Sequence, residues 1–206
     1  MDTNKLAGRI SSYLTFIFVL IAGLYLSFIV NASPKNQKNQ ATKIIPDESI
    51  YQSQINLEDQ NGAKTGLNIF EGSPVIVSMF YGSCNYSCPV LFDTIKKTLK
   101  ELPEEKMKLV KVLLVSFDPQ KDTVSSLQKL AKNHELDLSR WKLMRTSEDE
   151  VAELAALLDI KYRKIKGGDF NHTPYLGLLN EQGVLIVSAD NFGDGRAKII
   201  EAVSKL

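Results

Sequence analysis

Residues 74–89 read PVIVSMFYGSCNYSCP, and they carry the strongest signal for the fold of this chain. Its first part, residues 74–80, is a continuous apolar and β-branched run, which is typical of a central strand covered on both faces. A helix is indicated next, because Pro89 suits a first helical position and apolar residues recur on one helical stripe, namely Leu91, Ile95, Leu99 and Leu102. We therefore predict a buried strand that leads directly into a helix beginning at Cys88.

Strands and helices alternate on both sides of this stretch. Before it, residues 55–62 read as a strand and turn, with a return strand through residues 67–70. After it come a second central strand at residues 109–117 and a helix capped near Asp122 and Thr123. A helix with the capping-box pair Ser147 and Glu150 follows, then a hairpin of strands at 175–179 and 184–188, and a last amphipathic helix. The order β-β-β-α-β-α-α-β-β-α predicts an α/β, thioredoxin-like fold with an N-terminal β-hairpin extension.

Composition and charge narrow the classes of function. The chain has 206 residues, 44% of them hydrophobic and 24% charged, as in a globular protein. Lys and Arg number 25 against 24 Asp and Glu, so the net charge is only +1 and a nucleic-acid partner is not expected. No phosphate-binding loop of the Gly-x-x-x-x-Gly-Lys-Ser/Thr type occurs.

The N-terminal part predicts a membrane anchor. No charged side chain occurs from Ile10 to Pro34, and residues 13–30 are almost wholly apolar, about long enough to cross a hydrocarbon core of about 30 Å. Lys5 and Arg9 favour a cytoplasmic N-terminus. A cleaved signal peptide is the alternative, because the residues up to Ala32 end in a small-residue pattern, but the apolar run exceeds a usual signal core of about 7–15 residues.

The expected organisation therefore has four parts. Residues 1–9 form a cytoplasmic tail, residues 10–30 the single transmembrane helix, and residues 31–49 a polar linker with two prolines. Residues 50–206 form the folded domain, which lies outside the cytoplasm in this interpretation.

Both cysteines of the chain, Cys84 and Cys88, lie at the predicted joint between strand and helix. The N–H groups and positive dipole end of a helix N-terminus favour thiolate over thiol. If helical geometry begins near Cys84, the two residues share one face, so their sulfurs can form a disulfide or hold one soft ion such as Cu(I) or Zn(II). Because the spacing is not Cys-x-x-Cys, the usual thioredoxin redox interpretation is weakened. Two buried packing residues are the remaining alternative.

A third ligand would have to come from a distant part of the chain. His172 precedes the predicted back hairpin, and in a thioredoxin-like sheet the loop that enters this strand lies against the dithiol helix. The Thr173–Pro174 bond is a candidate for the cis proline of such folds. The other histidine, His134, lies at a helix end, and we interpret it as structural.

Together these residues resemble the Sco/SenC family. The resemblance rests on Cys84-x-x-x-Cys88-Pro89, Asp118-Pro-x-x-Asp122-Thr123 and His172-Thr173, and extends to Leu57-x-Asp59-Gln60-x-Gly62. It implies a membrane-anchored, thioredoxin-fold copper protein of cytochrome c oxidase assembly, with Cys84, Cys88 and His172 as copper ligands. It also implies that Asp118 lies near the site and tunes the thiolates or a partner surface. A simple turn with Pro119 is the equally weighted alternative for that aspartate.

Two classes of function follow from the resemblance and the dithiol. In the first, a metallochaperone delivers copper to the copper A site of cytochrome c oxidase or to another exported copper protein. In the second, an enzyme uses Cys84, as attacking thiol, and Cys88 to reduce the disulfide of such a partner. A redox or copper sensor is a third, weaker interpretation. Asn171 stands where many family members carry aspartate, which bears on the orientation of the imidazole, and Pro174 stands where an aliphatic residue is expected, which makes the loop more like that of a thiol oxidoreductase. We place the metallochaperone first, because simple dithiol exchange needs no histidine.

Overall fold

The computed structural model describes residues 45–83, 87–166 and 169–206, and for Ser87 and Cys88 it describes the backbone alone. These residues belong to one compact unit, Ile45–Leu206. The predicted tail, membrane helix and most of the linker lie outside the described residues. Within the described part of the chain, no helix has the length and apolar character needed to cross a membrane.

The centre of the unit is a mixed sheet, for which the described residues give seven strands in the order β2-β1-β5-β4-β3-β8-β9. Strands β3, β4 and β5 are parallel, while β1 and β8 are antiparallel to their neighbours. A separate antiparallel pair, β6 and β7, lies beyond this sheet. The strands are β1 (Asn56–Asp59), β2 (Lys64–Gly66), β3 (Val75–Phe80), β4 (Lys111–Ser116), β5 (Trp141–Arg145), β6 (Tyr162–Lys164), β7 (Phe170–His172), β8 (Leu176–Leu179) and β9 (Leu185–Ala189).

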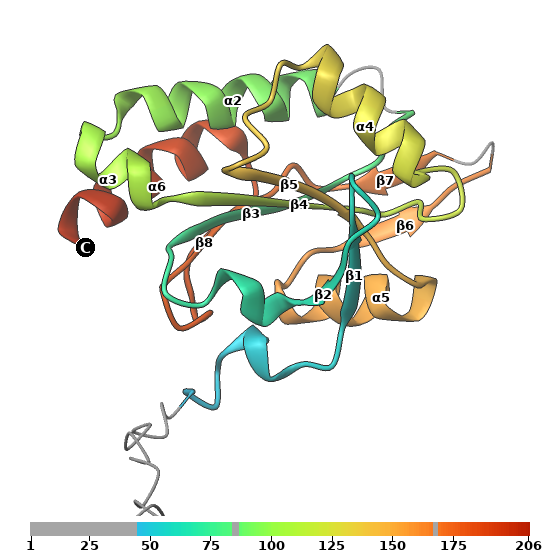
Figure 1. Cartoon of the computed structure of the whole chain (residues 1–206), viewed down its shortest axis with the longest axis horizontal. Helices are drawn as coiled ribbons and strands as arrows, with labels where there is room; N and C mark the ends of the chain where they lie inside the picture. The colour runs from blue at the N-terminus through green and yellow to red at the C-terminus, as the bar shows by residue number, and fades with distance from the viewer. Residues whose placement is uncertain (1–44, 84–86, 167–168) are drawn as a thin grey trace, which may run out of the picture. The chain divides into compact units, whose positions relative to one another are not determined.

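Helices cover both faces of the sheet (Figure 1). On one face, three helices pack their apolar stripes on the sheet: α2 (Ser87–Glu101), α4 (Val124–Asn133) and α6 (Phe192–Lys205). The short helix α3 (Glu104–Leu109) follows α2 in the chain and leads into β4. On the other face, α5 (Glu148–Leu157) and the 3-10 turns η1 (Ile50–Gln52) and η2 (Leu67–Phe70) enclose a second apolar core. Because both faces are covered, all six residues of β3 are buried, as the apolar run predicted.

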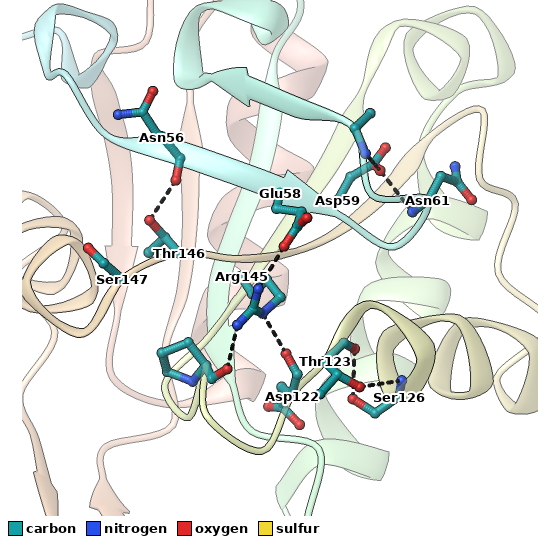
Figure 2. A network of polar contacts seen from close by, with 12 residues as sticks. Asn56, Glu58, Asp59, Asn61, Asp122, Thr123, Ser126, Arg145, Thr146 and Ser147 are labelled. Atoms are coloured by element: carbon teal, nitrogen blue, oxygen red, sulfur yellow. Dashed lines mark hydrogen bonds and ion pairs between the residues drawn. The ribbon is translucent and has the colours of Figure 1, made fainter.

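Local signals in the sequence identified most of these elements. Helix α2 begins one residue before Cys88, and Ser147 and Glu150 form the predicted capping box of α5. Thr123 caps α4, since its side chain accepts a hydrogen bond from the Ser126 N–H group (Figure 2). The predicted back hairpin is β8 with β9, which are antiparallel. The architecture is thus a mixed α/β fold, consistent with the predicted thioredoxin-like arrangement.

Two predictions of local structure were wrong, namely the return strand of the first hairpin and the cis Thr173–Pro174 bond, and three strands were not predicted. The return strand of the first hairpin is β2, whereas residues 67–70 form the 3-10 turn η2. Strand β5 and the β6–β7 pair were not predicted. Strand β5 escaped notice because Lys142 and Arg145 interrupt its apolar pattern; these side chains reach acidic partners, Asp59 and Glu58, on the neighbouring strand β1. The Thr173–Pro174 bond is trans, as is every peptide bond among the described residues.

The folded unit begins before the predicted domain boundary at residue 50. Ser49 is buried, caps η1 and donates its hydroxyl hydrogen to the Gln182 carbonyl oxygen. The Ile50 N–H group donates to the carbonyl oxygen of Gly183, so this segment is fastened to the β8–β9 turn. Residues 45–49 are therefore part of the domain rather than of a free linker.

Candidate metal and thiol centre

The cysteine-bearing loop connects the carboxyl end of β3 to the amino end of α2. Strand β3 ends at Phe80, and α2 begins at Ser87. Cys88 is the second residue of the helix, so its backbone lies in the first turn, where helical N–H groups lack intrahelical partners. Cys84 and the side chain of Cys88 lie outside the described residues, and the predicted approach of the two sulfurs remains a prediction.

His172 lies beside the start of this loop. It is the last residue of β7 and is half-buried. Its ring meets the ring of Tyr81, the residue after β3, edge to face with centroids 5.9 Å apart, and the ring of Phe117 at 5.3 Å. Since Tyr81 precedes Cys84 by only three positions, the structure brings the predicted imidazole ligand to the loop that carries the predicted thiolate ligand.

A backbone contact orients the His172 ring. Its Nδ1 atom lies 3.2 Å from the carbonyl oxygen of Thr173. In the tautomer that carries its proton on Nδ1, this atom donates to Thr173 and leaves Nε2 as the lone-pair donor for a metal ion. Ligating histidines commonly use such a bond to fix both tautomer and ring orientation.

Aromatic packing holds the hairpin that carries His172. The Phe117 ring, just beyond β4, stacks on Tyr162 with centroids 4.8 Å apart and on Phe170 at 5.9 Å. Phe170 also contacts Tyr81, with centroids 5.2 Å apart. The β6–β7 pair, although separate from the main sheet, is thereby attached to the carboxyl ends of β3 and β4. Sequence reasoning missed this because each strand has only three residues and no distinctive alternation.

Asp118 is 1% exposed and lies one residue after Phe117. Its carboxylate has two lysines nearby, with Lys121 Nζ 3.4 Å from Oδ2 and Lys164 Nζ 3.9 Å from Oδ1, but Oδ2 accepts no hydrogen bond among the described atoms. Its carbonyl oxygen accepts the N–H groups of Lys121 and Asp122, which forms a turn. Both expectations for this residue are therefore compatible with the structure: it shapes a turn, and Lys164 connects it to the hairpin that carries His172.

Asp122 has a role that the sequence did not indicate beyond its place in the Asp118-Pro-x-x-Asp122-Thr123 pattern. Its buried carboxylate accepts a hydrogen bond from the Gly82 N–H group, two residues before Cys84, and from the Ser116 hydroxyl. Burial raises the pKa of the Asp122 carboxyl, in spite of these hydrogen bonds, and the charge of Asp118 raises it further. The loop after β4 is thus bonded to the cysteine-bearing loop after β3.

The second histidine, His134, contacts different residues from those around His172. His134 ends α4 and stacks on Phe92 of α2, with centroids 4.1 Å apart, in agreement with the structural role expected for it. Among the residues whose side chains are described, no three His, Cys, Asp or Glu side chains form a group suited to a metal ion. Of the predicted ligand set, His172 is the one residue whose side chain the structure describes.

Comparison with known proteins decides the family. The family model described as SCO1/SenC matches residues 45–206, the whole of the folded unit. The chain belongs to the SCO1/SenC family. The resemblance predicted from the three motifs is therefore confirmed.

Relatives within the SCO1/SenC family are distant. A SCO1 protein homolog of Bacillus subtilis (strain 168) is 25% identical over 99 residues, which are 48% of this chain and 51% of the relative; the match spans about half the length of that protein. The structure of Bradyrhizobium japonicum ScoI with copper bound has a TM-score of 0.61 at 19% identity, covering 73% of this chain and 96% of ScoI.

A further solved structure of the family is BsSco, described as a member of the Sco family of cytochrome c oxidase assembly proteins in which a disulfide switch was identified. It has a TM-score of 0.62 at 23% identity and covers 72% of this chain and 88% of BsSco. At these identities, the likeness of BsSco and ScoI to this chain shows a shared fold.

Proposed function

We propose that this protein binds one copper ion through the thiolates of Cys84 and Cys88 and the imidazole of His172. In this proposal it delivers the ion to the copper A site of cytochrome c oxidase, or to another exported copper protein, during assembly. The observation that carries the proposal is the contact of the His172 ring with Tyr81, at the start of the cysteine-bearing loop, in a chain of the SCO1/SenC family.

The donor set suits the proposed cargo. Two thiolates and one imidazole are soft ligands that select Cu(I) over the common hard cations. The first turn of α2 favours the thiolate form of Cys88, and the Thr173 carbonyl oxygen orients the imidazole. From a site of two thiolates and one imidazole, a copper ion can pass to an incoming thiolate pair by stepwise ligand exchange.

One relative supports copper as the cargo, and another supports a role in oxidase assembly. Bradyrhizobium japonicum ScoI was solved with copper bound, and BsSco is described as a cytochrome c oxidase assembly protein. In the proposed arrangement, residues 10–30 anchor the chain in the membrane and the domain works outside the cytoplasm, where it meets an exported acceptor. The apolar run in the sequence supports this location.

Thiol–disulfide exchange is the second candidate function, favoured by the dithiol at a helix N-terminus and by the disulfide switch described for BsSco. The Cys84 thiolate would attack a partner disulfide, form a mixed disulfide and release one partner thiolate. The Cys88 thiolate would then attack the Cys84 sulfur, form the Cys84–Cys88 disulfide and release the second partner thiolate. The two cysteine protons end on the partner, which gains two electrons as this chain loses two.

A copper-binding experiment separates the two functions. The full chain, purified in detergent micelles, reduced and loaded anaerobically with Cu(I), would be titrated against a chromophoric Cu(I) chelator. We expect one tightly bound copper per chain, lost in Cys84→Ser and Cys88→Ser. We also expect His172→Ala to weaken binding by about 10-fold or more, because loss of even an outer-shell partner commonly costs about 10- to 100-fold in affinity.

The matched control is His134→Ala, which removes the histidine that stacks on Phe92. It should leave copper affinity unchanged even if it lowers the melting temperature. Irregular copper loading, or binding that is equal in His172→Ala and the wild type, would overturn the delivery function and favour thiol–disulfide exchange.

A further inference from the structure

A buried carboxylate holds the backbone of the cysteine-bearing loop. Asp122 is 4% exposed, and its Oδ1 and Oδ2 atoms lie 3.1 and 2.9 Å from the backbone nitrogen of Gly82, whose N–H group donates to both. The Ser116 hydroxyl donates to Oδ2 from the end of β4. Hydrogen bonds to an ionised acceptor are about twice as strong as neutral ones. The carboxylate therefore joins the ends of two neighbouring parallel strands at the point where the chain turns toward Cys84.

The fit between the two partners requires glycine at position 82. A Cβ atom there would lie only 2.4 Å from Asp122 Oδ1, which is closer than side-chain carbons approach oxygen atoms. Since Asp122 is buried and bonded to Ser116, its carboxylate cannot move away without loss of these bonds. The Asp122 carboxylate can therefore approach the backbone at position 82 this closely only because residue 82 is glycine.

Hydrogen bonds from Arg145 fix the backbone of the segment that contains Asp122. The Arg145 side chain of β5 donates from Nε to the Asp122 carbonyl oxygen at 2.9 Å and from Nη2 to the Pro119 carbonyl oxygen at 2.8 Å. Its Nη1 atom donates to Glu58 Oε2 of β1 at 2.6 Å. Figure 2 shows the guanidinium between Glu58 and the loop that contains Asp122. The segment 118–122 is therefore attached to the sheet on one side and to the cysteine-bearing loop on the other.

We propose that Asp122 is a positioning residue for Cys84. Through the Gly82 backbone it sets where the loop leaves β3, and thereby where the Cys84 thiol lies relative to Cys88 and His172. Asp122 acts on the backbone of the loop, through the hydrogen bonds that it accepts from the Gly82 N–H group. The effect on copper rests on the proposed function, whereas the effect on the loop and on thiol reactivity does not.

The proposal is tested on the reduced full chain in micelles with Asp122→Ala, Asp122→Asn and Gly82→Ala. The readouts are hydrogen exchange at the Gly82 amide, the ratio of alkylation rates of Cys84 and Cys88, and Cu(I) affinity. In Asp122→Ala we expect exchange at Gly82 to be about 10-fold faster or more, the alkylation ratio to change, and copper affinity to fall by about 10- to 100-fold.

Asp122→Asn should lie closer to the wild type, because an amide oxygen still accepts the Gly82 N–H bond and the amide nitrogen can donate to Ser116. Gly82→Ala alters the donor residue of the same hydrogen bond, and it should cause the same change in alkylation ratio and the same fall in copper affinity. The matched control is Asp59→Asn, another buried aspartate that accepts two backbone N–H bonds, within its own turn. It should change stability alone.

The proposal is overturned if Asp122→Ala matches the wild type in alkylation ratio and in copper affinity, or shifts them no more than Asp59→Asn does. A wild-type chain that binds no copper would contradict the proposed function. In that case, exchange at Gly82 and the alkylation ratio still decide the role of Asp122.

Discussion

The two histidines of the chain occupy contrasting surroundings. His134 lies at the end of a helix, and its ring stacks on the Phe92 ring with centroids 4.1 Å apart. Its carbonyl oxygen accepts a hydrogen bond from the Lys96 ammonium group. His172 ends a strand, meets Tyr81 edge to face, and lies next to the cysteine-bearing loop. The His134 ring packs between two helices. The His172 ring lies across the Tyr81 ring, and its Nδ1 atom faces the carbonyl oxygen of Thr173. This difference in surroundings is the reason why His172, and not His134, is the proposed copper ligand.

The largest expected effect comes from the aromatic residues beside each histidine. Phe117→Ala and Phe92→Ala should each destabilise the domain by about 3–5 kcal/mol, because both rings are buried and leave cavities. Only Phe117→Ala should also weaken copper binding, since Phe117 holds the hairpin that carries His172. Chemical unfolding and Cu(I) titration of both variants check this. Equal copper affinity in the two variants would remove the distinction between the histidines.

A smaller effect is expected from the charge next to the His172 hairpin. Lys164 lies 3.9 Å from Asp118 and 5.6 Å from the centre of the Phe170 ring. Because Lys164 is half-exposed, Lys164→Met should cost about 0.5–1 kcal/mol in unfolding free energy. Lys161→Met, an exposed lysine just before the same hairpin, is the control. A loss of equal size in both variants would contradict a specific role for Lys164.

The pH dependence of stability should report on His134. Burial lowers the pKa of His134 below its usual value of 6.5, and the charge of Lys96 lowers it further, against the opposing effect of Asp93. The unfolded chain therefore binds a proton more readily than the folded chain. This contribution to stability is complete above pH 6.5 and is lost as the pH falls from there toward the folded pKa. In His134→Gln, unfolding free energies measured from pH 8 to pH 5 should fall less steeply than in the wild type.

The smallest effect concerns the same pKa directly. Lys96→Gln removes the cation that faces the His134 carbonyl, so the pKa of His134 should rise toward its usual value while remaining lowered by burial. Titration of the imidazole proton resonances measures this shift. A pKa that is unchanged in Lys96→Gln would leave burial as the whole cause.

The local features of this protein follow directly from its amino-acid sequence. The apolar run before the cysteines specifies β3, the Ser147–Glu150 pair begins α5, and Asn180 to Val184 closes the β8–β9 hairpin. These features depend on residues a few positions apart, whose contacts follow from helix, strand and turn geometry. For the same reason, Cys88 was correctly placed at the start of a helix.

Contacts between distant residues depend on how the whole domain is assembled. Asp122 bonds Gly82 across 40 positions of the chain, and Lys142 reaches Asp59 across 83. The contact of His172 with Tyr81 depends on a hairpin with little sequence signal, held by Phe117. Such contacts depend on the order of strands in the sheet and on side-chain packing between loops. Local patterns do not encode that order. The place of His172 near the cysteine-bearing loop could be expected only by assuming a thioredoxin-like fold, and the bond of Asp122 to that loop appears only when the sheet is assembled.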